Sequence, residues 1–260
     1  MTQILVGADP EVFVRQNGGF VSAHGLIEGN KDHPQKVNRG AVQVDGMALE
    51  FNIDPAKDTD EFVLNITTVF EQLKLMVPNH EIAVVPVADF SLDYIRQQPR
   101  EARELGCNPD FDAYTGTVNQ KPQAERPMRT AAGHVHIGWG ENMAGHEEQA
   151  RAATIQMDFY LGLPSLFYDD DVRRRSMYGK AGCYRTKPYG VEYRTLSNAW
   201  LLNKESMAWV HRATVKGMQE LMAGNFLFEK FGDISSVINN SDKQAAARII
   251  EEAHLEVCNA

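Results

Sequence analysis

The chain has 260 residues, of which 43% are hydrophobic and 23% charged, and this composition is typical of a packed globular protein. Its 35 acidic residues outnumber the 26 basic ones and give a formal net charge of −9, which argues against sequence-independent binding to nucleic acid or to anionic lipid. No apolar run approaches the roughly 20 residues that span a bilayer, the N-terminal residues lack the basic region of a signal peptide, and the three cysteines are too scattered for a disulfide framework. The sequence therefore predicts a cytoplasmic protein.

Predicted strands dominate the first part of the chain. Alternating apolar residues and a turn at 17–19 predict strands over 11–16 and 20–23, and a longer strand is expected over 41–53. In this longer strand the apolar positions change parity at Asp45-Gly46, which we interpret as a β-bulge. Beyond the bulge, Glu50 faces away from its apolar neighbours.

A helix follows, and after it a stretch with little pattern. Asp58 and Glu61 form a capping pair ahead of an apolar stripe, which predicts a helix, and residues 82–87 read as a buried strand. Residues 88–128 have little periodicity and four prolines. Because long irregular segments in compact domains are usually functional, this region, with Asp110, Asp112, Arg126 and Arg129, is our candidate for substrate recognition.

The second half is richer in predicted helices. The expected elements, in chain order, are a strand over 134–138, a helix over about 145–162, strands over 184–185 and 191–196 around a turn at 187–190, and helices over about 203–223 and 242–257. Strands that precede helices predict an α+β fold with an antiparallel sheet. Nothing in the composition demands a domain boundary, so residues 1–260 are expected to form one catalytic domain that closes with the helices of 203–260.

Three of these strands place chemically active groups opposite apolar neighbours. The first carries Glu50, the second His134 and His136, and the third Glu192 and Arg194. Each set alone is also explained by half-exposed histidines or by a cross-strand salt bridge. If the strands share a sheet, however, one face is lined with carboxylates and imidazoles, the ligand set of Mg²⁺ or Mn²⁺.

A basic segment could supply positive charge for phosphate. Residues 173–194 contain seven Lys and Arg residues and one acid, Glu192, and glycines interrupt the run. A charge run is usually a solvated surface, but this one ends in the Glu192/Arg194 strand, which favours a phosphate-contacting loop. The chain has neither a P-loop nor a Gly-x-Gly-x-x-Gly motif.

An ordered set of short motifs resembles the glutamine-synthetase-like carboxylate–amine ligases, most closely the phage-type group called COOH–NH2 ligase type 2. The matching stretches are Gly7-Ala8-Asp9-Pro10-Glu11, Asp45-Gly46-Met47-Ala48-Leu49-Glu50-Phe51-Asn52, Gly106-Cys107-Asn108-Pro109-Asp110-Phe111, Ala132-Gly133-His134-Val135-His136-Ile137-Gly138 and Tyr189-Gly190-Val191-Glu192-Tyr193-Arg194. The resemblance implies a curved antiparallel sheet with helices on its convex face and an active site on the concave face. It also implies ATP-dependent joining of a carboxylate to an amine through an acyl phosphate, with ATP and Mg²⁺ (or Mn²⁺) as cofactors, and, for a phage protein, the host cytoplasm.

The resemblance also assigns roles to residues. It implies metal binding by Glu11, Glu50, His134 and Glu192. His136, Arg175, Arg185 and Lys187 are expected to contact ATP, and Arg194 to stabilise the transferring phosphoryl group beside Glu192 and Arg185. Only Glu11 and Glu50 can be assigned to a second metal, which leaves its third ligand open, with Asp9 and Asp45 as substitutes.

Other functions remain open from the sequence. A kinase on the same scaffold would stop at phosphoryl transfer, and a degenerate ligase would serve as a binding subunit. The spacing of His134, His136 and Glu141 also fits a cupin metal site, although the later histidines fall in predicted helices. The substrates, expected to be small-molecule or peptide carboxylates and amines, are not identified, and a homo-oligomer stays open.

Overall fold

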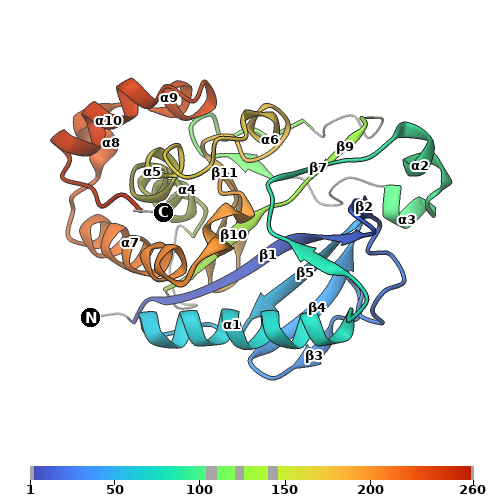
Figure 1. Ribbon diagram of the computed structural model, residues 1–260. Helices are drawn as coiled ribbons and strands as arrows, with labels where there is room; N and C mark the ends of the chain where they lie inside the picture. The colour runs from blue at the N-terminus through green and yellow to red at the C-terminus, as the bar shows by residue number, and fades with distance from the viewer. Residues whose placement is uncertain (1–2, 104–109, 121–125, 140–145, 259–260) are drawn as a thin grey trace.

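The computed structural model describes residues 3–103, 110–120, 126–139 and 146–258 (Figure 1). Among these residues, ten strands form one sheet, in which β2 and β6 pair with β1 beside the strand order β3-β4-β5-β1-β10-β12-β11-β8. Every pairing in this sheet is antiparallel, so the expected α+β fold with an antiparallel sheet is confirmed. The strands are β1 (Leu5–Gln16), β2 (Gly19–Val21), β3 (Gln35–Val37), β4 (Gly40–Asp45), β5 (Ala48–Ile53), β6 (Glu81–Ala83), β8 (Phe111–Asp112), β10 (Gly133–Gly138), β11 (Cys183–Lys187) and β12 (Gly190–Tyr193).

The predicted bulge at Asp45-Gly46 is wrong. β4 and β5 are two strands of a hairpin, in which Asp45 pairs with Ala48 across a two-residue turn. Gly46 has a φ of 59°, the positive value that the first position of a tight hairpin turn requires. A reversal of the chain changes the parity of the apolar positions just as a bulge does, which is why the pattern was ambiguous. The predicted direction of the Glu50 side chain is unaffected.

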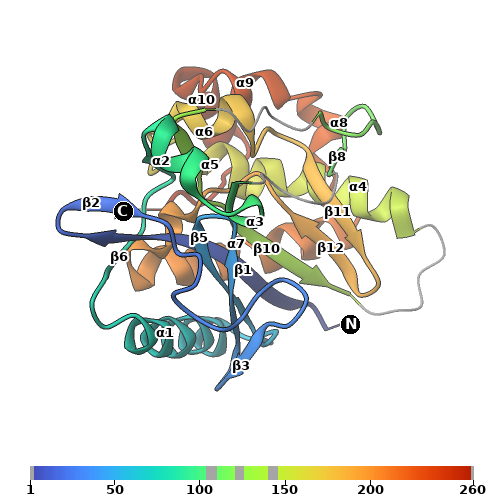
Figure 2. The same cartoon turned by 90° about the vertical axis from the view of Figure 1, so that its right-hand side faces the viewer.

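Helices cover one face of the sheet and enclose the main core. Helix α1 (Thr59–Met76) begins as predicted, because Asp58 accepts a hydrogen bond from the Glu61 backbone N–H (2.9 Å). Its buried stripe packs against β4 and β5, and beside it lie α7 (Lys204–Met222) and α4 (His146–Met157). Figures 1 and 2 show α1 on one side of the sheet, and α2 (Leu92–Gln97) and α3 (Arg100–Arg103) on the other.

The region after the first helix is more regular than its sequence suggested. The strand expected over 82–87 is split into β6 and β7 (Val87–Asp89), with Pro86 between them, and β7 pairs with β9 (Met128–Thr130) in a separate small sheet. With α2, α3 and β8, these elements contradict the expectation that 88–128 lacks regular structure, although two parts of it lie outside the described residues. A second apolar cluster around Phe13, Met47 and Phe90 fills the space beneath them.

The C-terminal part builds the remaining helical layer. Helix α4 continues through a π-helical turn, η1 (Asp158–Gly162), into α5 (Leu163–Ser165), and the loop after it leads to α6 (Val172–Met177). The β11–β12 hairpin turns at Pro188-Tyr189, as expected. The chain closes with the 3₁₀ turn η2 (Asn198–Leu202), α7, α8 (Leu227–Phe231), α9 (Ser235–Asn239) and α10 (Lys243–Glu252). No helix in the described ranges is long and apolar enough to cross a membrane.

Candidate active site

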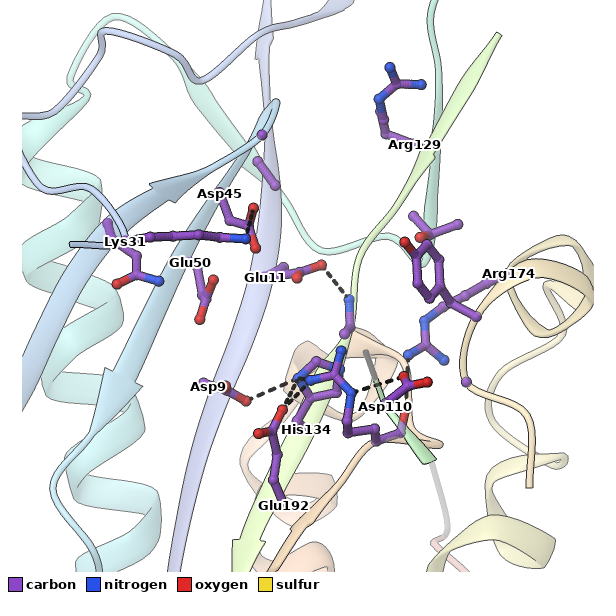
Figure 3. A pocket seen from close by; sticks show the side chains of 18 of the residues that line it. Asp9, Glu11, Lys31, Asp45, Glu50, Asp110, Arg129, His134, Arg174 and Glu192 are labelled. Atoms are coloured by element: carbon purple, nitrogen blue, oxygen red, sulfur yellow. Dashed lines mark hydrogen bonds and ion pairs between the residues drawn. The ribbon is translucent and has the colours of Figure 1, made fainter. Parts of the chain in front are cut away.

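A cavity of about 360 Å³ opens on the sheet face opposite α1 (Figure 3). Side chains alternate along β1, so Val6, Ala8 and Val12 enter the main core whereas Asp9 and Glu11 line the cavity. The same alternation on the neighbouring strands turns Glu50, His134 and Glu192 to this face. The lining is completed by Phe13, Lys31, Gln43, Asp45, Gly46, Met47, Ala48, Asp110, Arg129, Thr130, Ala132, Arg174, Tyr178, Gly179, Arg185, Lys187 and Arg194.

Strand register makes these residues direct neighbours. Glu11 lies opposite Glu50, and Asp9 opposite His134. Glu192 lies between His136 on β10 and Arg185 on β11. The strands that carry Glu50, the histidines and Glu192 therefore do share one sheet, and their polar groups share one face.

Three carboxylates form the first cluster, on the β4–β5 side of the cavity. Glu11, Asp45 and Glu50 each place an oxygen within 4.8 Å of the others. Glu11 accepts a hydrogen bond from the Ala132 backbone N–H (2.8 Å), and Lys31 Nζ lies 2.8 Å from Asp45 Oδ1. Burial and the neighbouring Asp45 charge raise the pKa of Glu11 to about 7. Burial and the surrounding acids raise the pKa of Glu50 well above its ordinary value.

The second cluster joins β1, β10 and β12. Asp9, His136 and Glu192 also bring ligand atoms within 4.8 Å of one another, and His136 Nε2 lies 3.1 Å from Asp9 Oδ2. Burial raises the pKa of Asp9, but His136 and His134 outweigh it and hold that pKa well below its ordinary value. The pKa of His136 is raised, because Asp9 and Glu192 outweigh its burial.

The two histidines lie on opposite sides of Asp9, since His134 Nδ1 is 3.2 Å from Asp9 Oδ1 and His136 Nε2 is 3.1 Å from Asp9 Oδ2. His134, expected among the metal ligands, has its Nδ1 3.5 Å from Glu192 Oε1 and 3.2 Å from Arg194 Nη1. Burial and this arginine lower the pKa of His134 to about 4, so the imidazole is neutral near pH 7. His136, expected to contact ATP, is the histidine of the second cluster, and the Tyr189 hydroxyl contacts its other ring nitrogen.

Cationic side chains surround Glu192. Lys187 Nζ lies 2.7 Å and Arg185 Nη1 3.5 Å from its carboxylate, and Arg194 contacts it directly. Burial and Asp9 raise the pKa of Glu192, but Arg194 and the histidines outweigh them and lower it to about 2. Arg194 also reaches Asp110, with 3.2 Å between Nε and Oδ2. Glu192 is therefore ionised, and it gathers three cations beside the second cluster.

Arg175 does not join the other predicted residues. Its guanidinium is buried against Asp169 (3.9 Å) and the Ser241 hydroxyl (2.9 Å), and the preceding residue, Arg174, lines the cavity instead. The sequence did not indicate Arg174, because α6 has only six residues and too few apolar positions to show which of its arginines faces the cavity. Asp110, expected to take part in substrate recognition, contacts Arg194, and this contact joins segments distant in the sequence.

The residues present fit divalent metal ions. In the first cluster, the buried carboxylates of Glu11 and Glu50 crowd one another and have raised pKa values, as is typical where a cation balances the negative charge. Asp9 Oδ1 and His136 Nε2 are buried without a hydrogen bond in the described part of the chain, although both lie near oppositely charged groups. Glu11, Asp45 and Glu50 would hold one ion, and Asp9, His136 and Glu192 a second. The oxygen-rich donor set favours Mg²⁺ or Mn²⁺.

A known structure shares the fold. A bifunctional glutathione synthetase from Pasteurella multocida matches 98% of this chain with a TM-score of 0.50 and 12% identity, but only 45% of its own length is covered. A glutamine synthase homolog matches 97% of the chain and 66% of its own length with 10% identity and a TM-score of 0.39. The chain thus spans less than half of the synthetase, and at this identity the likeness shows the fold alone.

Sequence comparison finds a family similarity in part of the chain. No curated protein matches the chain. The sequence profile of the family described as "Phage phiEco32-like COOH.NH2 ligase-type 2" matches residues 127–230. This segment includes β10, β11 and β12, which carry the histidines, Glu192 and the cations around it. The match confirms, over residues 127–230, the resemblance to the type 2 carboxylate–amine ligases that the motifs indicated.

Proposed function

We propose that this protein is an ATP-dependent carboxylate–amine ligase that forms an amide bond through an acyl phosphate. One observation carries the proposal: a single cavity joins two carboxylate-rich clusters to a wall of three cations, Arg185, Lys187 and Arg194. Divalent ions and cations are what phosphoryl transfer requires, because its catalysis is mostly positioning and neutralisation of charge.

The reaction needs two steps in this cavity. A carboxylate oxygen of the acid attacks the γ-phosphorus of ATP, the bond to the β,γ-bridging oxygen breaks, and ADP leaves. The amine nitrogen then attacks the acyl carbon, phosphate leaves, and the nitrogen loses a proton. Bound Mg²⁺ would neutralise phosphate charge in the first step.

The chain's own residues supply the rest. Arg194 has a pKa above its ordinary value, because Glu192 and Asp110 outweigh its burial, so it stays charged where negative charge develops on the transferring group. Lys187 and Arg185 extend the positive surface toward the β11–β12 turn. Glu192 orients all three cations, since its carboxylate contacts each of them.

The proposal is tested by phosphate release from ATP and Mg²⁺ across pools of carboxylates and amines. We expect release that requires one acid and one amine together, and formation of a hydroxamate when hydroxylamine replaces the amine. Glu192→Gln should lower the rate by about 10²–10³-fold, the range seen when one charge-stabilising group is removed. The exposed Glu148→Gln is the matched control. ADP release without free phosphate, even with every amine pool present, would indicate a kinase and contradict the proposal.

A further inference from the structure

A lysine from a loop reaches the first carboxylate cluster. Lys31 belongs to the segment between β2 and β3, and it lines the cavity together with Glu11, Asp45 and Glu50. Its Nζ lies 2.8 Å from Asp45 Oδ1, and Figure 3 shows the side chain stretched toward Asp45 on the side of the cavity that carries Glu50. None of the roles discussed so far uses this cation.

A tight turn holds the backbone of Lys31 in place. Asn30 and His33 exchange two backbone hydrogen bonds of 3.2 Å each. The Asn30 side-chain oxygen also accepts hydrogen bonds from the backbone N–H groups of Asp32 (3.1 Å) and His33 (3.0 Å). An asparagine that binds the backbone two and three residues further on is typical of a well-defined turn. Lys31 is the second residue of this turn.

The turn is attached to the hairpin that carries two acids of the cluster. The Gly29 carbonyl accepts a hydrogen bond from the Val44 backbone N–H (2.9 Å), one residue before Asp45. A Cβ at position 29 would lie 2.1 Å from the Val42 carbonyl oxygen, so this approach of loop to strand requires glycine. Because the backbone is fixed in this way, the long side chain of Lys31 is the part of the loop that can move.

The ammonium group and a metal ion would compete for the same carboxylate. Glu11, Asp45 and Glu50 carry a formal charge of −3 when all are ionised, and the ammonium of Lys31 offsets one unit of it. The side chains of Lys31 and Asp45 are 37% and 21% exposed, so their ion pair is partly solvated and weak. A divalent ion at Asp45 would repel the ammonium twice as strongly as a monovalent ion would. The lysine has a flexible stem with access to solvent, so it is the group that would leave.

We propose that Lys31 is a tethered cation, which pairs with Asp45 until a divalent ion binds to the first cluster and then withdraws toward solvent. Before metal binding the ammonium would reduce repulsion among the three acids, and its displacement would lower the affinity of the cluster for metal. The inference concerns metal binding and does not depend on the ligase reaction, so each can fail without the other.

Titration calorimetry with Mn²⁺ alone, on metal-free protein at low ionic strength, tests the competition. Lys31→Met keeps the apolar stem and removes the charge. We expect it to bind one Mn²⁺ about 10-fold more tightly than the wild type does, the effect of one unit charge a few ångströms from a divalent ion in water. Lys31→Arg, which keeps the charge, and the exposed control Lys36→Met on β3 should match the wild type.

Two outcomes of the titration would overturn the inference. The first is unchanged or weaker Mn²⁺ binding by Lys31→Met, with its folding verified by circular dichroism, because a lysine that only pairs at the surface or that assists the metal would give this result. The second is the absence of Mn²⁺ binding in both proteins, which would also remove the cation site.

Amine labelling of the wild type tests the withdrawal without any substitution. Lysines would be acetylated briefly with acetic anhydride, with and without saturating Mn²⁺, and quantified by mass spectrometry. Lys31 should react several-fold faster with Mn²⁺, because its amine leaves Asp45 for solvent, whereas Lys36 should react at the same rate. A Lys31 rate that stays constant or falls would contradict the withdrawal. If both results are as expected but no pool of acids and amines releases phosphate from ATP, the ligase function alone is refuted.

Discussion

Replacing Glu11 by Gln should make the metal-free protein more stable, although Glu11 lines the proposed active site. Its carboxylate is crowded by Asp45 and Glu50 and buried in the cavity, which raises its pKa to about 7. A glutamine keeps the oxygen that accepts the Ala132 N–H, so the backbone contact survives the substitution. The substitution therefore removes repulsion and desolvation without removing a hydrogen bond.

The magnitude follows from the shift in pKa. The pKa rises from an ordinary 4.5 to about 7, and at about 1.4 kcal/mol per unit this corresponds to about 3 kcal/mol. Below pH 4.5 Glu11 is protonated in both states and costs nothing. As the pH rises toward 7 the unfolded chain loses the proton first, so the native state loses stability, and the full loss is present at pH 8. For a chain of this size, about 3 kcal/mol corresponds to about 6–12 °C in Tm.

Thermal unfolding in EDTA would measure the effect. At pH 8 Glu11→Gln should unfold at the higher temperature, at pH 4 the two proteins should converge, and the exposed Glu148→Gln should match the wild type throughout. Saturating Mg²⁺ should stabilise the wild type by about 2.7 kcal/mol at 100-fold its Kd, and the variant much less. A variant that is less stable in EDTA at pH 8, or that gains as much from Mg²⁺, would refute the role of Glu11 in a cation site.

Three further outcomes test the site and its support. Mg²⁺ affinity of the wild type, measured by calorimetry, should increase from pH 6 to pH 8 with release of protons, because Glu11 must lose its proton to bind; a constant affinity would contradict this. Tyr193→Phe should cost about 2 kcal/mol in urea unfolding, because the Tyr193 hydroxyl donates to the buried Asp158 (2.7 Å) behind the Glu192 strand; an unchanged midpoint would refute this. Gly190→Ala should cost more than about 3 kcal/mol, because the new Cβ would lie 1.9 Å from the Ile137 carbonyl oxygen, whereas Gly19→Ala, which meets nothing, should be neutral.

Alternation was sufficient to predict which side chains share the cavity. In β5, β10 and β12 the apolar residues face the helices, and this alone turned Glu50, His134 and Glu192 to the other face. The prediction was robust because a strand has only two faces. It also survived the mistaken bulge, since Glu50 keeps its parity relative to Leu49 whether the chain bends or reverses before it.

Register was the information that the sequence lacked. The third acid of the first cluster is Asp45, which reaches Glu11 and Glu50 because the hairpin turn brings it alongside β5. A bulge would have carried Asp45 along the strand instead. Likewise, His134 and His136 share a face, but only the pairing of β10 with β12 sets His136 opposite Glu192 and brings His134 between Glu192 and Arg194.

Missing information on long-range contacts also explains why the sequence pointed to Arg175 although Arg174 lines the cavity. Consecutive residues of a helix point about 100° apart, so the rotation of α6 about its axis determines which arginine enters the cavity. The contacts of α6 with other parts of the chain fix this rotation. Arg175 contacts Asp169 and Ser241. Arg174 donates hydrogen bonds to the carbonyls of Thr195 and Arg194. Because those carbonyls follow directly from the Glu192 strand, Arg174 is tied to the part of the sheet that carries the proposed chemistry. Substitution at Arg174 should therefore affect binding in the cavity, and substitution at Arg175 should affect the packing of α6.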